Sequence, residues 1–258
     1  MHPYSELLFQ SSLITVRWYG FLIALGVLLA YYFSLREVRL LKISESKFDS
    51  VFLLTLFFGI VGARIGFVVQ NTTYFSSHII EMFRIWDGGL SIHGALILGA
   101  ITLFVSARNL KINIIKVANV IAPNVMLAAA IGRWGNFFNQ EIVGKPTDSA
   151  LKLFIDPAKR PVGFEDVANY HPVFLYESIL LLIGFIIFRI FKNRLEGFAL
   201  AYTLIIYSSI RIIIEFWRID YKPILIGLDL AQIVSCGIIV ITLVFYFAGK
   251  RSLTSSAA

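Results

Sequence analysis

The residues best suited to chemistry lie in one glycine-rich stretch, residues 131–144, which has the sequence I-G-R-W-G-N-F-F-N-Q-E-I-V-G. An arginine can bind phosphate or carboxylate at two points, and glycine lets the backbone approach a ligand closely. The stretch follows an apolar run, and charged groups at membrane depth cost roughly 2.5–3.5 kcal/mol each, so they usually face a cavity or a partner. A single Arg–Glu pair could instead snorkel to the interface, but the cluster as a whole favours a ligand site. Its polar members are Arg133, Asn136, Asn139 and Glu141.

Charged residues interrupt three further apolar runs. His93 lies among glycines in D-G-G-L-S-I-H-G-A, where a proton acceptor and a structural histidine are about equally expected. Arg211 and Glu215 are four residues apart and so share one helical face, either as a helix-stabilising ion pair or as part of a polar site. Arg64 lies between Gly62 and Gly66, whose spacing predicts a close-packing face for another helix. Two roles for Arg64 remain open: partner of a buried carboxylate, or wall of a polar cavity.

Composition places these residues in a membrane protein. The chain is 58% hydrophobic, its mean hydropathy is +0.78, and apolar runs recur along its whole length. The net charge of +7 is better explained by basic residues at helix ends than by nucleic-acid binding. One cysteine, Cys236, excludes a disulfide framework, and the four histidines lack metal-ligand spacing. We therefore expect no metal, no other cofactor and no nucleic-acid partner.

The apolar pattern predicts an all-α polytopic protein with seven transmembrane helices in a single domain, residues 1–258. The predicted spans are residues 13–35, 51–70, 90–106, 117–134, 173–191, 197–217 and 227–248. The longest polar stretch, around residues 137–171 between the fourth and fifth spans, predicts a small extracytoplasmic cap or arm.

Lysine and arginine concentrate in the linkers after the first, third and fifth predicted spans and in the C-terminal tail. The positive-inside rule therefore places the N-terminus outside and the C-terminus in the cytoplasm. With this orientation His93, Arg133 and Arg211 come from different spans but fall at one depth, in the outer half of the membrane.

Several arginines, a histidine and few free carboxylates favour an anionic substrate such as a lipid phosphate entering from the outer leaflet. The sequence lacks H-E-x-x-H, G-x-S-x-G and the acidic D-x-x-D-G set of metal-dependent phosphotransfer. A binding or transport protein for an anionic lipid or solute would use the same arginines without chemistry, and this alternative remains open on the residues alone.

Residues 132–144, G-R-W-G-N-F-F-N-Q-E-I-V-G, resemble the signature G-R-x-G-N-F-x-N-x-E-x-x-G of bacterial prolipoprotein diacylglyceryl transferases at every fixed position. Further segments resemble that family in order and spacing, namely R-W-Y-G, G-G-L-S-I-H-G, H-P-V-F-L-Y-E and R-I-I-I-E-F-W-R. The seven-span architecture with an external N-terminus is also similar to that of the family.

The resemblance implies an enzyme of the bacterial cytoplasmic (inner) membrane. Such an enzyme transfers diacylglycerol from phosphatidylglycerol to the lipobox cysteine of preprolipoproteins, which is the first step of lipoprotein maturation. The reaction releases glycerol-1-phosphate without a cofactor, and we expect a monomer. By resemblance Arg133 binds phosphatidylglycerol, and activity requires Asn136, Glu141, Gly144, Tyr19, His93, Arg211 and Glu215.

The mechanism that we expect is displacement at the glycerol carbon that bears the phosphate ester. Arg133 and Arg211 would hold the phosphate, with Gly144 in the lipid-binding site, while His93 would accept the thiol proton. Asn136 and Glu141 would position Arg133 or the glycerol head group. Two positions depart from the family pattern: Asn119 replaces a common Asp, and Ala95 replaces the second glycine of H-G-G.

Overall fold

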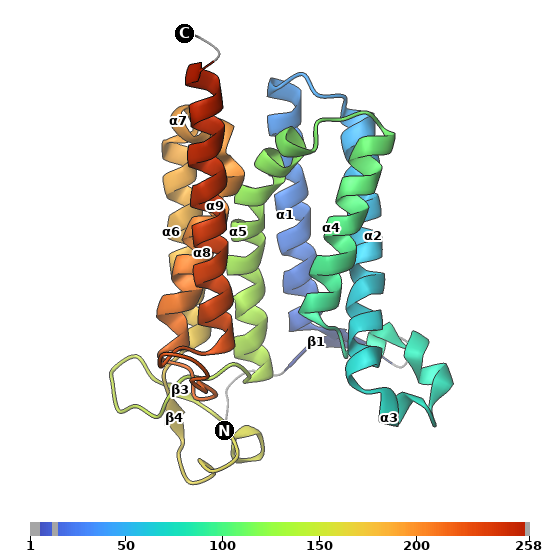
Figure 1. Ribbon diagram of the computed structural model, residues 1–258. Helices are drawn as coiled ribbons and strands as arrows, with labels where there is room; N and C mark the ends of the chain where they lie inside the picture. Colours follow the sequence, from blue (N-terminus) through green and yellow to red (C-terminus); the bar gives the residue numbers. More distant parts are fainter. Residues whose placement is uncertain (1–5, 12–14, 256–258) are drawn as a thin grey trace. The chain divides into compact units, whose positions relative to one another are not determined.

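The computed structural model describes residues 6–11 and 15–255 and is mainly helical. The chain divides into two compact units, one holding the chain up to Phe33 and from Asn119 onwards, the other holding residues 34–118. The boundaries fall inside two long helices, so each unit is described separately. In chain order the long helices are α1 (Trp18–Leu40), α2 (Glu45–Gln70), α4 (Ile92–Asn109), α5 (Ile114–Asn139), α6 (Val173–Ile190), α8 (Ala199–Glu215) and α9 (Leu230–Ser255) (Figure 1).

The protein is a multi-pass membrane protein. Six of its described helices, α1, α2, α4, α5, α6 and α9, are long and apolar enough to cross a bilayer. The sixth predicted span, residues 197–217, corresponds to α8, which has only 17 residues. A helix of this length extends about 26 Å, which is less than the roughly 30 Å hydrocarbon core, so α8 remains only a predicted span.

The first predicted span begins too early. Residues 15–17 form strand β2 (Thr15–Arg17), which pairs with β1 (Leu7–Gln10), and α1 begins only at Trp18. Residues 12–14 lie outside the described part of the chain. The β-branched Thr15 and Val16 favour the extended strand, and the apolar run then continues as helix to Leu40.

The fourth predicted span ends too early. We expected the helix to stop at Trp134, but α5 continues to Asn139, so Arg133 and Asn136 are helical. The glycines in these last turns provide close approach between helices: a Cβ on Gly132 would lie 2.9 Å from Ile23 of α1, and one on Gly135 would overlap the Tyr19 ring. Small residues at such contacts stabilise membrane helix pairs, which offsets the low helix propensity of glycine.

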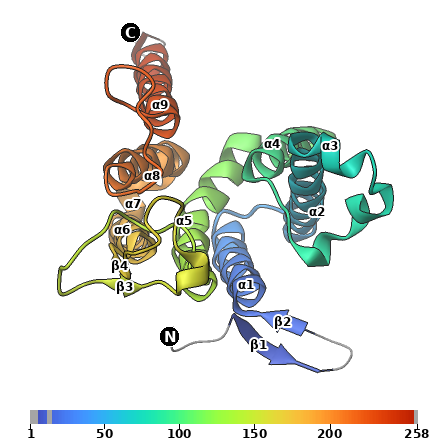
Figure 2. The same ribbon diagram turned by 90° about the horizontal axis from the view of Figure 1, so that it is seen from below.

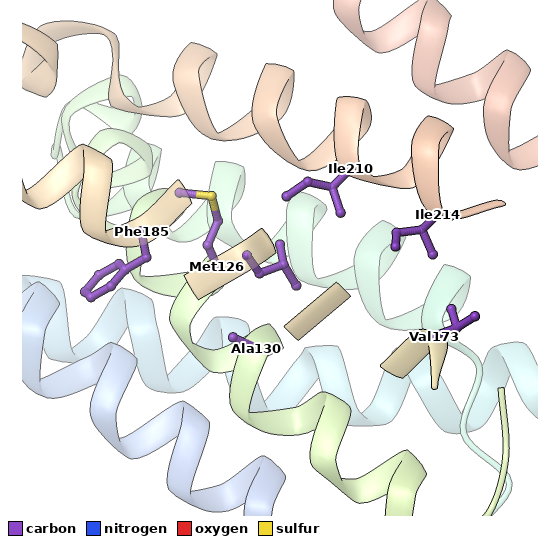
Figure 3. Close-up of a cluster of buried hydrophobic side chains, with 7 residues drawn as sticks. Met126, Ala130, Val173, Phe185, Ile210 and Ile214 are labelled. Atoms are coloured by element: carbon purple, nitrogen blue, oxygen red, sulfur yellow. The ribbon is translucent and has the colours of Figure 1, made fainter. Parts of the chain in front are cut away.

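In the first unit, α5, α6 and α8 pack around one apolar cluster (Figure 3). Viewed from below, α8 lies between α6 and α9 (Figure 2). Ser178 of α6 donates to the Ala130 carbonyl of α5 at 2.8 Å, and Tyr202 of α8 donates to the Gly184 carbonyl of α6 at 2.8 Å. The cluster is formed by Met126, Ala130, Val173, Leu181, Phe185, Ile210 and Ile214.

Asn119 fixes the start of α8. Its Oδ1 accepts from the Leu200 backbone N–H at 2.8 Å and its Nδ2 donates to the Gly197 carbonyl at 3.3 Å. An aspartate could accept the first bond but could not donate the second. These two hydrogen bonds therefore give a local structural reason why Asn119 stands where the resemblance leads us to expect Asp.

The segment predicted to form the cap is folded, although its residues 137–139 belong to α5; its position outside the membrane stays a prediction, and we call residues 140–172 the cap. Residues 140–172 contain the strand pair β3 (Leu153–Phe154) and β4 (Asn169–Tyr170) and the short helix η3 (Pro157–Lys159). Tyr170 is fully buried, and its hydroxyl lies 2.8 Å and 2.9 Å from the carbonyls of Phe164 and Val167. A small apolar core formed by Val143, Leu153, Ile155, Tyr170 and Phe174 joins the cap to α6.

In the second unit, α2 packs against α4 (Figure 1), so α4 is the helix that the Gly62/Gly66 face was predicted to contact. Gly62 and Gly66 of α2 face Gly94 of α4, where a Cβ on Gly62 would overlap the Gly94 carbonyl and lie 2.5 Å from the Leu98 Cβ. The backbones thus approach closely, as the Gly62/Gly66 spacing predicted.

Arg64 bonds to backbone carbonyls and not to a carboxylate of the described residues. Its side chain is buried and donates to four backbone carbonyls, those of Glu81, Met82, Gly88 and Gly89. These carbonyls belong to the α2–α4 connection, which contains α3 (Thr72–Phe75), η1 (Ile79–Phe83) and η2 (Ile85–Asp87). Among the described residues Arg64 therefore organises a loop rather than pairing with a carboxylate, and its second possible role, in the wall of a polar cavity, stays a prediction.

We expect Gly62→Ala to destabilise the second unit by roughly 1–3 kcal/mol, because the added methyl must push α2 and α4 apart. The midpoint of thermal unfolding in detergent measures this effect. Gly237→Ala is the matched control, since a Cβ there meets no atom within 4 Å. Equal midpoints for the two variants would contradict the close packing of α2 on α4.

Candidate active site

Arg133 and Glu177 form the central contact of the site. Arg133 lies near the end of α5 and Glu177 lies one turn inside α6. The Arg133 Nη2 is 2.6 Å from the Glu177 Oε1, and the Glu177 side chain is 0% exposed. The apolar cluster and the Ser178–Ala130 hydrogen bond hold the two helices together at this level. A buried carboxylate requires such a partner, because an unpaired charge in an apolar interior is strongly destabilising.

Arg211 and Glu215 of α8 continue the contact. The Arg211 Nη2 is 2.6 Å from the Glu215 Oε2, which confirms that the pair shares one helical face. The Arg211 Nη1 is 3.6 Å from the Glu177 Oε2, so two arginines from different helices face the same buried carboxylate.

The alternating ion pairs continue just beyond α8. Arg218 lies 3.2 Å from the Glu215 Oε1 through its Nε and 2.6 Å from the Asp220 Oδ2 through its Nη2. Hydrogen bonds from Arg218 hold the pKa of Asp220 below its usual range. The six side chains, Arg133, Glu177, Arg211, Glu215, Arg218 and Asp220, thus alternate in sign, and we call them the charge network.

The charge network corrects our expectation of few free carboxylates near the arginines. Its three arginines are faced by three carboxylates, so the arginines already have carboxylate partners within the protein. Arg133 and Arg211 nevertheless remain 20% and 16% exposed, and in the described chain only their Nη groups contact a carboxylate. Other nitrogens of their guanidinium groups can still donate to an anion.

Asn136 and Glu141 pair with each other rather than with Arg133. The Asn136 Nδ2 donates to the Glu141 Oε1 at 2.9 Å, and the Asn139 Nδ2 lies 3.3 Å from the same oxygen. Glu177, not Asn136 or Glu141, is therefore the residue that holds Arg133 in place. The other expected role of the Asn136–Glu141 pair, which is to position the head-group glycerol, stays a prediction.

The backbone after α5 directs Glu141 back toward Asn136. The Gln140 and Glu141 N–H groups bond to the carbonyls of Phe137 and Asn136, a Schellman-type helix end. Gln140 and Ile142 both have φ of 55°, although neither is glycine. Left-handed backbone costs about 1–2 kcal/mol per residue. Two bonds between the Gln140 side chain and Asp156, both 2.8 Å, help to hold this turn.

Tyr19 and Gly144 lie beside these residues in the same unit. The Tyr19 ring packs against Gly135, and Tyr19 is close enough to Glu141 and Arg133 to interact electrostatically with both. The Gly144 N–H donates to the His171 carbonyl at 3.0 Å, and a Cβ on Gly144 would lie 2.6 Å from the His171 Cβ. Gly144 thus has a structural reason to be glycine, and its predicted contact with lipid is untested.

His93 is an exposed residue at the start of α4 and belongs to the second unit. Its predicted role as a base therefore remains a prediction. Within the described residues, no group of three or more His, Cys, Asp or Glu side chains is arranged to hold a metal ion.

Glu177 is the main site residue that our choice of candidates missed. The signal was present, because H-P-V-F-L-Y-E places a carboxylate one turn inside an apolar span, where a charge usually has a functional partner. Arg133 is 44 residues away from Glu177 in sequence, so no helical spacing could pair them.

Comparison with known proteins identifies the class of membrane protein to which this site belongs. Residues 6–248 match the model of the prolipoprotein diacylglyceryl transferase family, and the chain belongs to that family. A phosphatidylglycerol–prolipoprotein diacylglyceryl transferase of Streptococcus equi subsp. zooepidemicus is 39% identical over 249 residues, covering 94% of each chain. Proteins of the same name from Parasynechococcus marenigrum and Acaryochloris marina are 41% and 35% identical, covering 85% and 95% of this chain and 81% and 92% of their own.

Proposed function

We infer that this protein transfers the diacylglyceryl group of phosphatidylglycerol to the lipobox cysteine of preprolipoproteins, the first step of lipoprotein maturation. The observation that carries this inference is the pair of arginines, Arg133 and Arg211, that face one buried carboxylate within a membrane-spanning unit. Arginine binds phosphate through planar, two-point hydrogen bonding, which suits a phospholipid head group. The family relationship supports the same substrates.

In the proposed reaction, the cysteine sulfur of the preprolipoprotein attacks the carbon of the diacylglycerol moiety that carries the phosphate ester. A C–S thioether bond forms, the C–O bond breaks, and its electron pair leaves with the phosphate oxygen of glycerol-1-phosphate. Arg133 and Arg211 bind the phosphate and stabilise the charge that develops on this leaving group. Their fixed positions supply that stabilisation without reorganisation during the reaction.

The thiol must lose its proton, because thiolate is the attacking species. We assign the proton to His93, because histidine is the side chain that most often serves as a general base. Tyr19 and the Asn136–Glu141 pair, which lie near Arg133, position the head-group glycerol. Gly144 has no side chain and so lets the polypeptide backbone lie close to the bound lipid head group.

The site lies toward the outside of the cytoplasmic membrane in this proposal. The uneven distribution of lysine and arginine supports an external N-terminus and a cytoplasmic C-terminus. The cap, residues 140–172, and the end of α5 would then face the compartment in which preprolipoproteins present their lipobox.

The direct test uses purified protein, phosphatidylglycerol and a lipobox peptide. The peptide mass should increase by one diacylglyceryl group, and glycerol-1-phosphate should appear in equal amount. A protein that only binds or transports lipid would leave the peptide mass unchanged, and this result would contradict the proposal.

Arg133→Lys should lose most transfer activity, on the order of 100-fold, because an ammonium cannot reproduce the two-point grip on phosphate. Initial rates with phosphatidylglycerol and a lipobox peptide measure the loss. Arg17→Lys, at a side chain that is 61% exposed, is the matched control and should retain its rate. Near-normal turnover of Arg133→Lys would mean that only the charge of Arg133 matters.

His93→Ala and His93→Gln should both nearly abolish transfer, since glutamine keeps hydrogen bonding but is not basic. Cys236→Ala should transfer normally, because Cys236 lies within α9 and the nucleophile comes from the substrate. If His93→Gln kept close to the full rate, His93 would be a structural hydrogen-bonding residue, and Glu141 and Tyr19 would become the next candidates for the base.

Reporter fusions test the orientation. Fusions after Arg194 and at Ala258 should report the cytoplasm, and a fusion near Asp156 should report the outside, as the basic linkers require. The reverse pattern would place the site on the cytoplasmic side and would contradict the proposed location.

A further inference from the structure

Glu177 contacts the two proposed phosphate-binding arginines in different ways. Its Oε1 is 2.6 Å from the Arg133 Nη2. Its Oε2 is 3.6 Å from the Arg211 Nη1 and accepts no hydrogen bond from the described residues, although the oxygen is buried. Glu177 thus fixes Arg133 directly, while its second oxygen places an unbonded negative charge next to Arg211.

Arg211 does not need Glu177 to hold it in place. Glu215 already pairs with Arg211 at 2.6 Å, and Arg218 holds Glu215 from the other side at 3.2 Å. Each of the two phosphate-binding arginines therefore has its own carboxylate partner. What the Glu177 Oε2 adds is negative charge at the point toward which both arginines are directed.

In the proposed reaction the substrate and the product carry different charges, so the Glu177 carboxylate affects their binding differently. Phosphatidylglycerol carries a phosphodiester with one negative charge, whereas glycerol-1-phosphate is a monoester that is mainly doubly charged near neutral pH. Coulomb attraction grows with the charge of the ligand, so a site with excess positive charge binds the product more tightly than the substrate. Arg133 and Arg211 without Glu177 would form such a site.

We propose that Glu177 is a positioning residue that also lowers the affinity of the site for the doubly charged product, so that glycerol-1-phosphate leaves and phosphatidylglycerol can enter. The proposal rests on the proposed function, because it assigns the phosphate to Arg133 and Arg211. The buried Glu177 carboxylate offsets one arginine charge both when phosphatidylglycerol is bound and when glycerol-1-phosphate is bound. It therefore opposes binding of the dianion about twice as strongly as binding of the monoanion.

Glu177→Gln is the most informative variant, because the amide oxygen can still accept from Arg133 while the charge is lost. The inhibition constant of glycerol-1-phosphate should fall on the order of tenfold. The KM for phosphatidylglycerol should fall less, and kcat should decrease as product release slows. Glu177→Asp, which restores the charge, should return product inhibition toward the wild-type value.

Glu165→Gln is the matched control, since it removes the same charge from an exposed residue of the cap. It should leave product inhibition unchanged. A Glu177→Gln variant with a raised KM and weaker product inhibition would show that Glu177 only holds Arg133 in position. That result would overturn the proposal, as would unchanged inhibition.

A measurement on the unaltered protein does not depend on the folding of any variant. Calorimetry in detergent can compare glycerol-1-phosphate with glycerophosphoglycerol, the singly charged deacylated form of phosphatidylglycerol. We expect the dianion to bind no more tightly than the monoanion, and a clear preference for the dianion would overturn the proposal. If the wild type failed to transfer diacylglycerol, the proposed function would fall, but these Kd values would still decide whether the site discriminates by charge.

Discussion

The structure of the site depends on one constraint, which is that charged side chains within an apolar unit must be paired. Glu177 is completely buried, and arginines of α5 and α8 face its two carboxylate oxygens. The same pairing fixes the direction of both guanidinium groups before any substrate arrives. Such preorganisation is useful for catalysis, because fixed donors stabilise developing charge without having to rearrange. The stability of the fold and the readiness of the site thus come from the same contacts.

The helices around the charge network are held by features that keep backbones close. Gly132 and Gly135 let α5 approach α1, and Ser178 ties α6 to the Ala130 carbonyl of α5. Asn119 fixes the first turn of α8, from whose other end Arg211 and Glu215 project. Small residues and isolated hydrogen bonds replace the hydrophobic driving force, which is weak between helices in lipid. The positions of the charged groups therefore depend on residues that are themselves uncharged.

The sequence predicted the features that follow from local spacing. The membrane class, six of the spans, the Arg211–Glu215 pair and the Gly62/Gly66 packing face all agree with the structure. Contacts between distant segments could not be predicted, because no periodicity links Arg133 to Glu177 or Arg64 to four loop carbonyls. Helix ends were also misplaced where tertiary contacts outweigh propensity. We expected the fourth span to end at Trp134, yet packing of Gly132 and Gly135 against α1 keeps the following segment helical.

The most direct test of the proposed phosphate site is a structure of the full chain in a lipid nanodisc with bound phosphatidylglycerol. A phosphate should lie within hydrogen-bonding distance of both Arg133 and Arg211, with Glu177 still paired to Arg133. The head-group glycerol should lie near Asn136 and Glu141. A phosphate bound elsewhere, for example on the basic residues of the cap, with the two arginines contacting only their carboxylates, would show that Arg133 and Arg211 do not bind the substrate.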